Sequence, residues 1–486
     1  MDIKNNKFVV KYQGLPPQVK ASFWFLVCMV LQKGISVITT PIFTRLLGPT
    51  NYGEFGLYNS WESIITVFVT LKLTAGVYTQ GLVKFERERE EFSVAMQGLS
   101  SFIIACYFVV YLLFMNYFNN LFSLNTYEMI AMFVIMWSDA VFSFWLCEQR
   151  VDYKYKYLVI VTLVVSVIKP VAGIFAVTHF EDQVTARVVS LAIVSAIFYT
   201  PFLFGKIKLK KPFFNKRIWK YALMFNLPLI PHYLSQTVLS KADTIMIGKM
   251  IGADKAGIYN LSYSLAMLLL IINSAMMQTM TPWMYKKMRD RRIQDIKGVA
   301  YISLMAIACL NLFLIVFAPE IIKIFAPPAF YEAIWVIPPI AMSGVFIFSY
   351  DLFASYEFYY EKTIFVMIAS IVGAVLNVGL NFIFIPKFGY VAAGYTTLIC
   401  YVFYAIGHYL FMNRICRYEF DGAKPYNFKM LLLIYAVFLG IGFGIMFTYE
   451  HFILRMCIVA ALLAVLYFNR KKIMGFIKEL AAMRKG

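Results

Sequence analysis

Apolar stretches of about 20 residues recur along the whole chain and alternate with short polar segments. A helix of that length crosses the roughly 30 Å hydrocarbon core of a bilayer. The pattern therefore predicts an all-α polytopic membrane protein with about 14 transmembrane helices. The predicted spans are residues 21–44, 54–76, 93–117, 127–147, 157–178, 184–204, 219–243, 257–281, 298–318, 332–356, 363–385, 391–412, 429–448 and 450–469.

Composition supports this class and excludes an ordinary soluble domain. Of the 486 residues, 61% are hydrophobic and 15% are charged, and the mean hydropathy is +0.70. Soluble domains carry about 25% charged residues. The connections between the predicted spans are all short, so they leave no room for a catalytic domain outside the membrane.

Basic residues lie mostly on one side of the predicted spans. A net charge of +19 would suit nucleic-acid binding in a soluble protein. Here, however, thirty-four of the 45 Lys and Arg fall in the two tails and the even-numbered connections, and six fall in the odd-numbered connections. This positive-inside bias predicts that both termini are cytoplasmic, and we expect no nucleic-acid partner. The basic stretch Gly205 to Lys220 is interpreted as a topology signal, with contact to anionic membrane lipids as the alternative.

The chain repeats one glycine-containing corner. "PIFTRLLGPTNYGEFGLY" (Pro41 to Tyr58) and "IMIGKMIGADKAGIYNLS" (Ile245 to Ser262) align Gly48 with Gly252 at an offset of 204 residues. The offset spans six helices, an even number, so both copies have the same orientation, as in transporters built from parallel repeats. We therefore predict two six-helix lobes around a central cavity. The predicted parts are an N-terminal lobe (1–204), a cytoplasmic basic linker (205–220), a C-terminal lobe (221–413), and helices 13 and 14 with a basic tail (414–486).

The motifs give no support for enzymatic or metal chemistry. The seven cysteines lie singly and the four histidines are scattered, so neither set has the spacing of metal ligands. We find no P-loop, no nucleophile elbow and no Asp-x-Asp phosphosugar motif. We expect no catalytic residue, no bound metal and no cofactor, and we predict that the protein is not an enzyme.

Three stretches carry a family resemblance. They are "KGISVITTPIFTRLLGPTNYGEFGLY" (Lys33 to Tyr58), "KADTIMIGKMIGADKAGIYNLSYSL" (Lys241 to Leu265) and "NVGLNFIFIPKFGYVAAGYTTL" (Asn377 to Leu398). With these stretches the chain resembles the Wzx-type O-antigen repeat-unit flippases, which form the polysaccharide transporter branch of the MATE-like flippase superfamily.

The resemblance implies a transport function. Such proteins move undecaprenyl-pyrophosphate-linked oligosaccharides from the cytoplasmic to the periplasmic leaflet of the bacterial cytoplasmic (inner) membrane. It implies a lipid-linked oligosaccharide as substrate, a proton or sodium ion for coupling, and a glycan polymerase and a chain-length regulator as partners. The superfamily also contains lipid II, teichoic or teichuronic acid and multidrug exporters, and the motifs do not separate these.

Ionisable side chains inside the predicted spans mark candidate sites, because charge is costly in hydrocarbon. Lys33 in helix 1 lies roughly 18 Å from the inner edge, and Glu62 in helix 2 lies roughly 13 Å from the outer edge. These depths coincide, so an ion pair between them is geometrically allowed. Two interpretations remain open: a structural pair or snorkelling lysine, and a cavity cation whose pairing with a protonatable Glu62 changes during transport.

Two more helices carry a possible pair of opposite charges. Asp139 in helix 4 and Lys169 in helix 5 both fall in the middle third of the predicted core. Asp139 and Lys169 fit two roles equally well: packing within the lobe, or lining the cavity. Lys72, near the cytoplasmic end of helix 2, suits either a first contact with pyrophosphate or an interfacial anchor.

Three further charges lie near the predicted outer face. Arg45 suits either a bidentate phosphate contact or an interfacial anchor. Lys241 and Asp243 are two residues apart, about 200° around a helix, so they point apart rather than pair. The candidate substrate-binding cations are thus Lys33, Arg45, Lys72, Lys169 and Lys241, and the candidate ion-coupling or charge-pairing acids are Glu62, Asp139 and Asp243.

Other polar and helix-breaking residues have structural interpretations. Asn377 and Asn381 share a helix face and suit hydrogen bonds between helices. Arg187, at the start of helix 6, is interpreted as snorkelling. The "PPIAMSG" stretch beginning at Pro338 predicts a kink in helix 10.

Rival functions would need different features. A drug exporter would favour an anionic cavity for organic cations, whereas lysines outnumber acids among the mid-membrane charges. A membrane glycan polymerase or ligase needs a sizeable periplasmic loop with catalytic Arg or His, and every predicted outer connection is short. A scaffold that transports nothing fits poorly with five buried cations.

Overall fold

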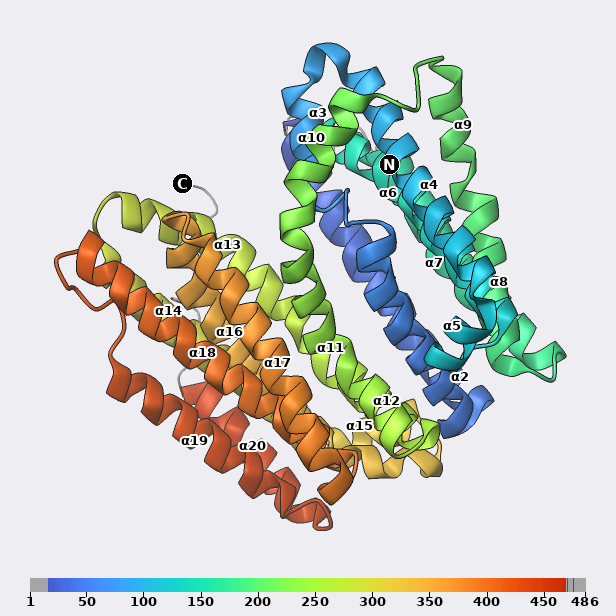
Figure 1. Ribbon diagram of the computed structural model, residues 1–486. Helices are drawn as coiled ribbons and strands as arrows, with labels where there is room; N and C mark the ends of the chain where they lie inside the picture. The colour runs from blue at the N-terminus through green and yellow to red at the C-terminus, as the bar shows by residue number, and fades with distance from the viewer. Residues whose placement is uncertain (1–15, 469, 471–474, 476–486) are drawn as a thin grey trace, which may run out of the picture. The chain divides into compact units, whose positions relative to one another are not determined.

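The computed structural model describes residues 16–468, 470 and 475. Within these residues the chain is helical and contains no strand, so the all-α prediction is confirmed (Figure 1). The chain divides into two compact units, Met1–Leu234 and Ser235–Gly486, and the boundary in sequence falls within α11 (Ile230–Met250). The predicted boundaries at 204, 220 and 413 stay predictions.

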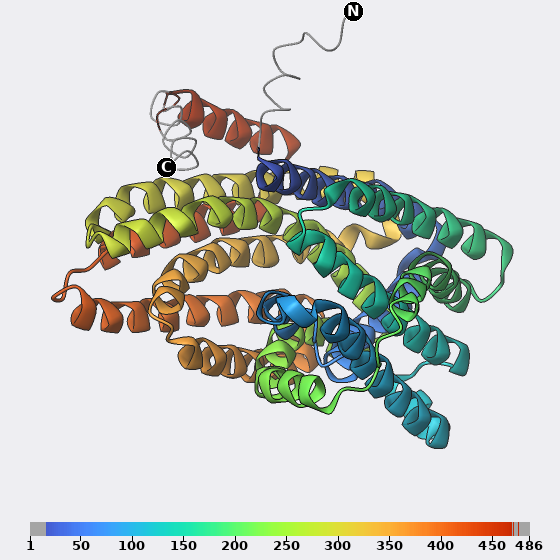
Figure 2. The same ribbon diagram turned by 90° about the horizontal axis from the view of Figure 1, so that it is seen from above.

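The first unit holds the first six predicted spans. Within it α6 and α7 both pack on α8, and α7 also packs on α2; α7 and α8 run side by side in Figures 1 and 2. Its helices before α11 are α2 (Pro17–Val69), α3 (Val77–Lys84), η2 (Glu86–Glu88), α4 (Arg89–Leu113), α5 (Met115–Phe122), α6 (Thr126–Val151), α7 (Tyr155–His179), α8 (Gln183–Tyr199), α9 (Pro201–Lys208), α10 (Lys216–Asn226) and η3 (Leu227–Leu229).

The second unit repeats this packing. Here α16 and α17 pack on α18, and α14 packs on α16 as α4 packs on α6 in the first unit; α19 covers α14 and α16, and α20 covers α14. Its helices after α11 are α12 (Ala253–Ala266), η4 (Met267–Leu269), α13 (Leu270–Arg289), η5 (Ile293–Asp295), α14 (Ile296–Val316), α15 (Ala318–Phe325), η6 (Pro328–Trp335), α16 (Ile337–Tyr359), α17 (Thr363–Phe388), α18 (Val391–Glu419), α19 (Phe428–Met446) and α20 (Phe452–Phe468).

Within the described residues, eleven helical stretches are long and apolar enough to cross a membrane. The difference from fourteen predicted spans has three causes. The two arms of the 53-residue α2 account for two predicted spans. The predicted span 219–243 falls on α10, η3 and α11, which carry many polar residues, and α20 has 17 residues, slightly fewer than the usual 20.

The repeated corner has the expected backbone. The two arms of α2 meet at Gly48, where the backbone is not helical (φ 65°, ψ 179°), and Gly252 separates α11 from α12 (φ 155°, ψ 162°). Side chains with a Cβ rarely adopt these positive φ values, so glycine lets the chain turn at both corners.

The basic segment 205–220 is attached to the first unit along α4. A Cβ on Gly98 would lie 2.1 Å from the Phe213 carbonyl oxygen, so only glycine permits this close approach. Trp219 Nε1 donates to the Ala95 carbonyl at 2.9 Å. The side chain of Asn215 caps α10 through the backbone N–H groups of the first turn. The segment is therefore part of the packed surface of the first unit.

One expected kink is wrong. Pro338 and Pro339 occupy the first turn of α16, directly after the 3₁₀ helix η6. A proline in the first turn removes no hydrogen bond, because the N–H groups there have no partner inside the helix. The predicted span 332–356 thus starts with a change of helix type rather than bending in its middle.

Candidate functional site

The predicted second span is interrupted. α2 ends at Val69 and α3 starts at Val77, so the span predicted as residues 54–76 is not one helix. Between them Leu71 and Lys72 have φ values of 47° and 48°. The left-handed conformation costs a residue with a Cβ about 1–2 kcal/mol, and such outliers concentrate at functional sites. Transporters place ions and substrates where a membrane helix is unwound.

A polar cavity of about 160 Å³ lies beside this break, within the first unit. Three of the predicted site residues share it: Glu62, Lys72 and Asp139. The lining therefore carries two acids and one lysine, which is not the cation-rich wall that the sequence predicted. The full lining is Glu62, Thr66, Thr70, Lys72, Leu73, Thr74, Ser100, Met136, Asp139, Ala140, Ser143 and Phe144.

The expected partner of Asp139 is in place. Lys169 Nζ on α7 lies 3.6 Å from Asp139 Oδ1 on α6, and the same ammonium lies 5.1 Å from the centre of the Tyr199 ring. The positive charge of Lys169 is thus compensated within the unit. α7 continues past Pro170 without a break.

The pair that depth allows between Lys33 and Glu62 is not observed. Lys33 is exposed, and in the described part of the chain no ion pair joins it to Glu62. Matching depth does not fix the direction in which a helical side chain points, and Lys33 lies on an exposed face of its arm. Lys72 lines the same cavity as Glu62.

The two remaining predicted cations are not part of the cavity. Arg45 is exposed, and its Nη1 donates to the Pro41 carbonyl at 2.8 Å, which caps the end of the first arm of α2. Lys241 is half-buried on α11 in the second unit.

Asp243 is the centre of a buried polar cluster in the second unit. Its side chain is 1% exposed and accepts hydrogen bonds from Tyr259 Oη (2.5 Å), Asn381 Nδ2 (2.6 Å) and Thr397 Oγ1 (2.7 Å). Asn381 on α17 thus bonds to Asp243 on α11, so a contact between helices is observed for Asn381, which also donates to Asn377 of its own helix at 3.4 Å. The cluster joins α11, α12, α17 and α18 and concentrates carboxylate, amide and hydroxyl oxygens, the ligands that hard cations prefer. Among the described residues, no group of three or more His, Cys, Asp or Glu is placed to hold a metal.

The family follows from the sequence. The model of the "Polysaccharide biosynthesis protein" family matches residues 19–288, more than half of the chain. The chain belongs to this family. The MatE family model also matches residues 228–383, so the resemblance to the polysaccharide branch of the MATE-like superfamily is confirmed.

A relative and two solved structures agree with this family. The "Lsg locus putative protein 1" of Haemophilus influenzae is 21% identical over 386 residues, which cover 74% of this chain and 89% of the relative. The lipid II flippase MurJ, in an inward closed conformation, has a TM-score of 0.68 at 14% identity and covers 92% of this chain and 99% of its own. An inward-facing multidrug resistance MATE transporter has a TM-score of 0.60 at 15% identity and covers 79% of this chain and 95% of its own. At these identities the two structures establish the fold alone.

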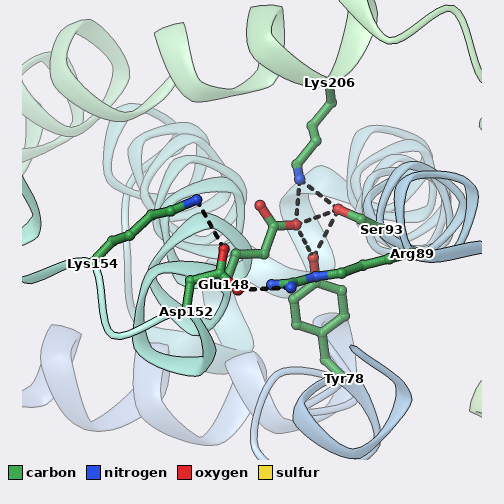
Figure 3. Close-up of polar contacts among 7 residues, drawn as sticks. All are labelled: Tyr78, Arg89, Ser93, Glu148, Asp152, Lys154 and Lys206. Atoms are coloured by element: carbon green, nitrogen blue, oxygen red, sulfur yellow. Dashed lines mark hydrogen bonds and ion pairs between the residues drawn. The ribbon is translucent and has the colours of Figure 1, made fainter. Parts of the chain in front are cut away.

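A second polar cluster, which the sequence did not reveal, joins four helices of this family member. Figure 3 shows Tyr78, Ser93 and Lys206 converging on Glu148. Tyr78 Oη donates to Glu148 Oε1 at 2.5 Å, and Ser93 and Lys206 bind the same oxygen. Lys206, assigned above to a topology signal, is 8% exposed, so its charge holds α9 against α3, α4 and α6. We interpret this cluster as structural, since each polar group has a partner.

One further charge was misjudged from the sequence, and one buried pair was not predicted. Arg187 does not snorkel: its guanidinium carbon lies 3.6 Å from the ring centres of both Phe43 and Phe55, between the two arms of α2. His408 has a partner, because its Nδ1 lies 2.9 Å from both carboxylate oxygens of Glu357, and neither side chain is exposed. The members of these contacts are distant in sequence, and no motif relates them.

Proposed function

We propose that this protein is a flippase that moves undecaprenyl-pyrophosphate-linked oligosaccharide repeat units from the cytoplasmic to the outer leaflet by alternating access. The observation that carries the proposal is the charged cavity beside an unwound membrane helix, in a chain of the polysaccharide biosynthesis family. Charges inside a membrane protein mark substrate and ion pathways. No bond is made or broken in this function, so the protein is not an enzyme.

The phosphates of the carrier lipid are the part of the substrate that the cations would hold. At low dielectric an anionic headgroup needs a counter-charge, because the attraction between opposite charges is much stronger there than in water. Lys33 and Arg45 are exposed, and Arg45 suits a bidentate phosphate contact. Lys72 and Lys241 are half-buried, and Lys169 contributes through its pair with Asp139.

The polyprenyl tail has a matching surface in the second unit. An apolar groove of about 430 Å³ lies between α16, α18 and α19 and is lined almost wholly by aliphatic and aromatic side chains, among them Phe346, Ile406 and Leu432. Burying an isoprenoid chain there is favourable without any polar contact. The tail would then follow the groove while the sugar headgroup crosses.

An ion gradient would supply the energy, since no nucleotide-binding motif occurs in the sequence. Glu62, Asp139 and Asp243 are the candidate acids for coupling to a proton or to sodium. The protein would act in the bacterial cytoplasmic membrane with both termini cytoplasmic, beside a glycan polymerase and a chain-length regulator.

A multidrug exporter is the second candidate, and the cavity is the observation that favours it. Two acids and one lysine line the cavity, a balance that suits an organic cation better than an anionic lipid. Export of teichoic or teichuronic acids or of lipid II is a narrower alternative within the same chemistry as our proposal.

Proteoliposomes with the purified full-length protein separate these candidates. We expect protein-dependent movement of an undecaprenyl-pyrophosphate-linked oligosaccharide and no protein-dependent uptake of ethidium, an organic cation. Ethidium uptake without lipid movement would contradict the proposal. For coupling, movement should collapse with a protonophore or on sodium depletion, and indifference to both would refute an ion-driven cycle.

A further inference from the structure

A buried amide holds the unwound segment that follows α2. The side chain of Asn226, the last residue of α10, has no exposed surface, and its Nδ2 donates to the Leu71 carbonyl at 2.5 Å. We propose that Asn226 is a positioning residue: through this bond it keeps the chain unwound after Val69 and places Lys72 in the wall of the cavity. The inference rests on the proposed function only for the role of Lys72 as a substrate contact, and its geometry lies within the first unit.

The unwound segment leaves one backbone carbonyl without its helical partner. In a continuous helix the N–H of Ala75 would donate to the carbonyl of Leu71, four residues earlier. Here the Ala75 N–H donates to the Lys72 carbonyl at 2.9 Å and closes a tighter turn. A carbonyl inside a membrane span has little water to bond, so losing its partner is costly. The Asn226 amide supplies the missing donor and therefore stabilises the unwound form relative to the helical form.

The unwound segment needs such support because its backbone is unfavourable. Leu71 and Lys72 have φ values of 47° and 48°, which residues with a Cβ rarely adopt. Strained backbone of this kind persists only where surrounding contacts fix it. A second contact lies at the far end of the segment, since a Cβ on Gly76 would lie 3.3 Å from Phe225 Cε1 and 3.4 Å from Tyr233 Oη. Residues of α10 and α11 thus hold the segment at both ends.

The direction of the Lys72 side chain depends on this backbone. The Lys72 N–H donates to Thr70 Oγ1 at 3.2 Å, and the half-buried Lys72 side chain lines the cavity together with Glu62 and Asp139. A return to helical φ values would change the sign of the φ torsion at Lys72 and redirect its side chain. Loss of the Asn226 amide should therefore remove position 72 from the cavity wall, although Asn226 itself does not line the cavity.

The second unit offers a matched control for a merely structural asparagine. Asn273 is 2% exposed, and its Nδ2 donates to the Gly344 carbonyl at 2.9 Å. In both Asn226 and Asn273, Oδ1 is buried and has no hydrogen-bond partner among the described residues. The two side chains thus make the same kind of bond, but Gly344 lies inside the helix α16 and not in an unwound segment. A merely structural role predicts that Asn226→Leu and Asn273→Leu behave alike.

Chemical labelling at position 72 tests the positioning without any lipid substrate. The full-length protein with Lys72→Cys is purified in detergent and treated with a small cationic methanethiosulfonate reagent. Mass spectrometry of the labelled peptide separates this site from the seven native cysteines. We expect Asn226→Leu to slow labelling at position 72 at least tenfold and Asn273→Leu to change it less than twofold. Adding Leu71→Gly to Asn226→Leu should restore most of the rate, because glycine adopts a positive φ without steric cost.

The outcomes separate positioning from folding and from transport. Recovery of labelling by Leu71→Gly cannot come from misfolding, so it supports the inference even if Asn226→Leu is less stable. Equal labelling with and without Asn226→Leu, equal slowing by Asn226→Leu and Asn273→Leu, or no recovery by Leu71→Gly would overturn it. In proteoliposomes that retain Lys72, Asn226→Leu should slow lipid movement several-fold. The expected labelling pattern in a protein that moves no lipid would overturn the proposed function and leave the role of Asn226 standing.

Discussion

Lys169 Nζ lies 3.6 Å from Asp139 Oδ1, so one ion pair joins α7 to α6 beside the cavity of the first unit. The side chains of Lys169 and Asp139 are 24% and 46% exposed. Part of the pair therefore faces the cavity, and its strength depends on what the cavity contains. A pair of this kind can stabilise the unit.

Lys169→Met should lower the stability of the protein by about 1 kcal/mol, because Asp139 then lacks its cation but remains partly exposed. The double variant Lys169→Met with Asp139→Asn should regain most of that loss, since no lone charge is left. Thermal unfolding in one detergent checks this. If the stability changes of Lys169→Met and of Asp139→Asn alone simply add in the double variant, the ion pair does not contribute to stability.

Asp243→Asn should destabilise the second unit by about 2 kcal/mol. The amide nitrogen would face one of the three groups that now donate to the carboxylate, and a buried donor left without an acceptor is costly. The matched control is Asp254→Asn, an exposed acid at the start of α12, which should change stability by less than about 0.5 kcal/mol. Equal thermal stability of the two variants would contradict a structural role for the Asp243 cluster.

His408→Phe should destabilise the protein by about 1–3 kcal/mol, because it leaves the Glu357 carboxyl, which has no exposed surface, without its hydrogen-bond partner. Replacing both members, Glu357→Leu with His408→Phe, removes the unpartnered buried carboxyl and should restore much of the stability. His179→Phe changes an exposed histidine and serves as control. Unfolding temperatures of the four proteins decide the matter, and a double variant less stable than His408→Phe would contradict this account.

Asp152 gives a prediction for pH dependence. Partial burial raises the pKa of Asp152, but Arg89 at 2.7 Å and Lys154 at 3.1 Å outweigh burial, so the pKa lies below its ordinary value of 3.8 (Figure 3). A depressed pKa means that the ionised group stabilises the fold above pH 3.8 and that this contribution is lost as pH falls through the folded-state pKa. Arg89→Gln should therefore be less stable than the wild type at neutral pH, and the difference should shrink in acid. A difference in unfolding temperature that is constant from pH 7 to pH 3 would be evidence against this ion pair.

Much of the fold was predictable from the sequence, because a membrane helix is specified by length and apolar content alone. Each of the fourteen predicted spans overlaps a described helix, although the second is broken after Val69, and the corner at Gly48 has the left-handed backbone that glycine permits. The break after Val69 was not predictable. The segment from Leu71 to Gly76 is apolar enough to continue a helix, and its backbone depends on contacts with distant residues, such as the bond from Asn226 Nδ2 to the Leu71 carbonyl at 2.5 Å.

The candidate site was predictable only in part. Charges inside spans are rare and costly, so Glu62, Lys72 and Asp139 could be selected before their shared cavity was known. The ion-pair partners of these residues could not be predicted in the same way, because they depend on how each helix is rotated about its own axis. Depth alone suggested Lys33 for Glu62, whereas Lys33 lies on an exposed face. Glu357 and His408 are 51 residues apart and follow no motif, so only the packing of α16 on α18 reveals them.

The most direct test compares two lipids that differ only in charge. Proteoliposomes containing the purified protein receive one oligosaccharide attached to undecaprenyl pyrophosphate, or the same oligosaccharide attached to a neutral polyprenyl lipid. Access of an external lectin to the sugar then reports movement between leaflets. The account predicts protein-dependent movement of the pyrophosphate lipid and movement of the neutral lipid only at the rate of protein-free vesicles. Equal protein-dependent rates for both lipids would show that positive side chains do not escort the headgroup and would contradict the account.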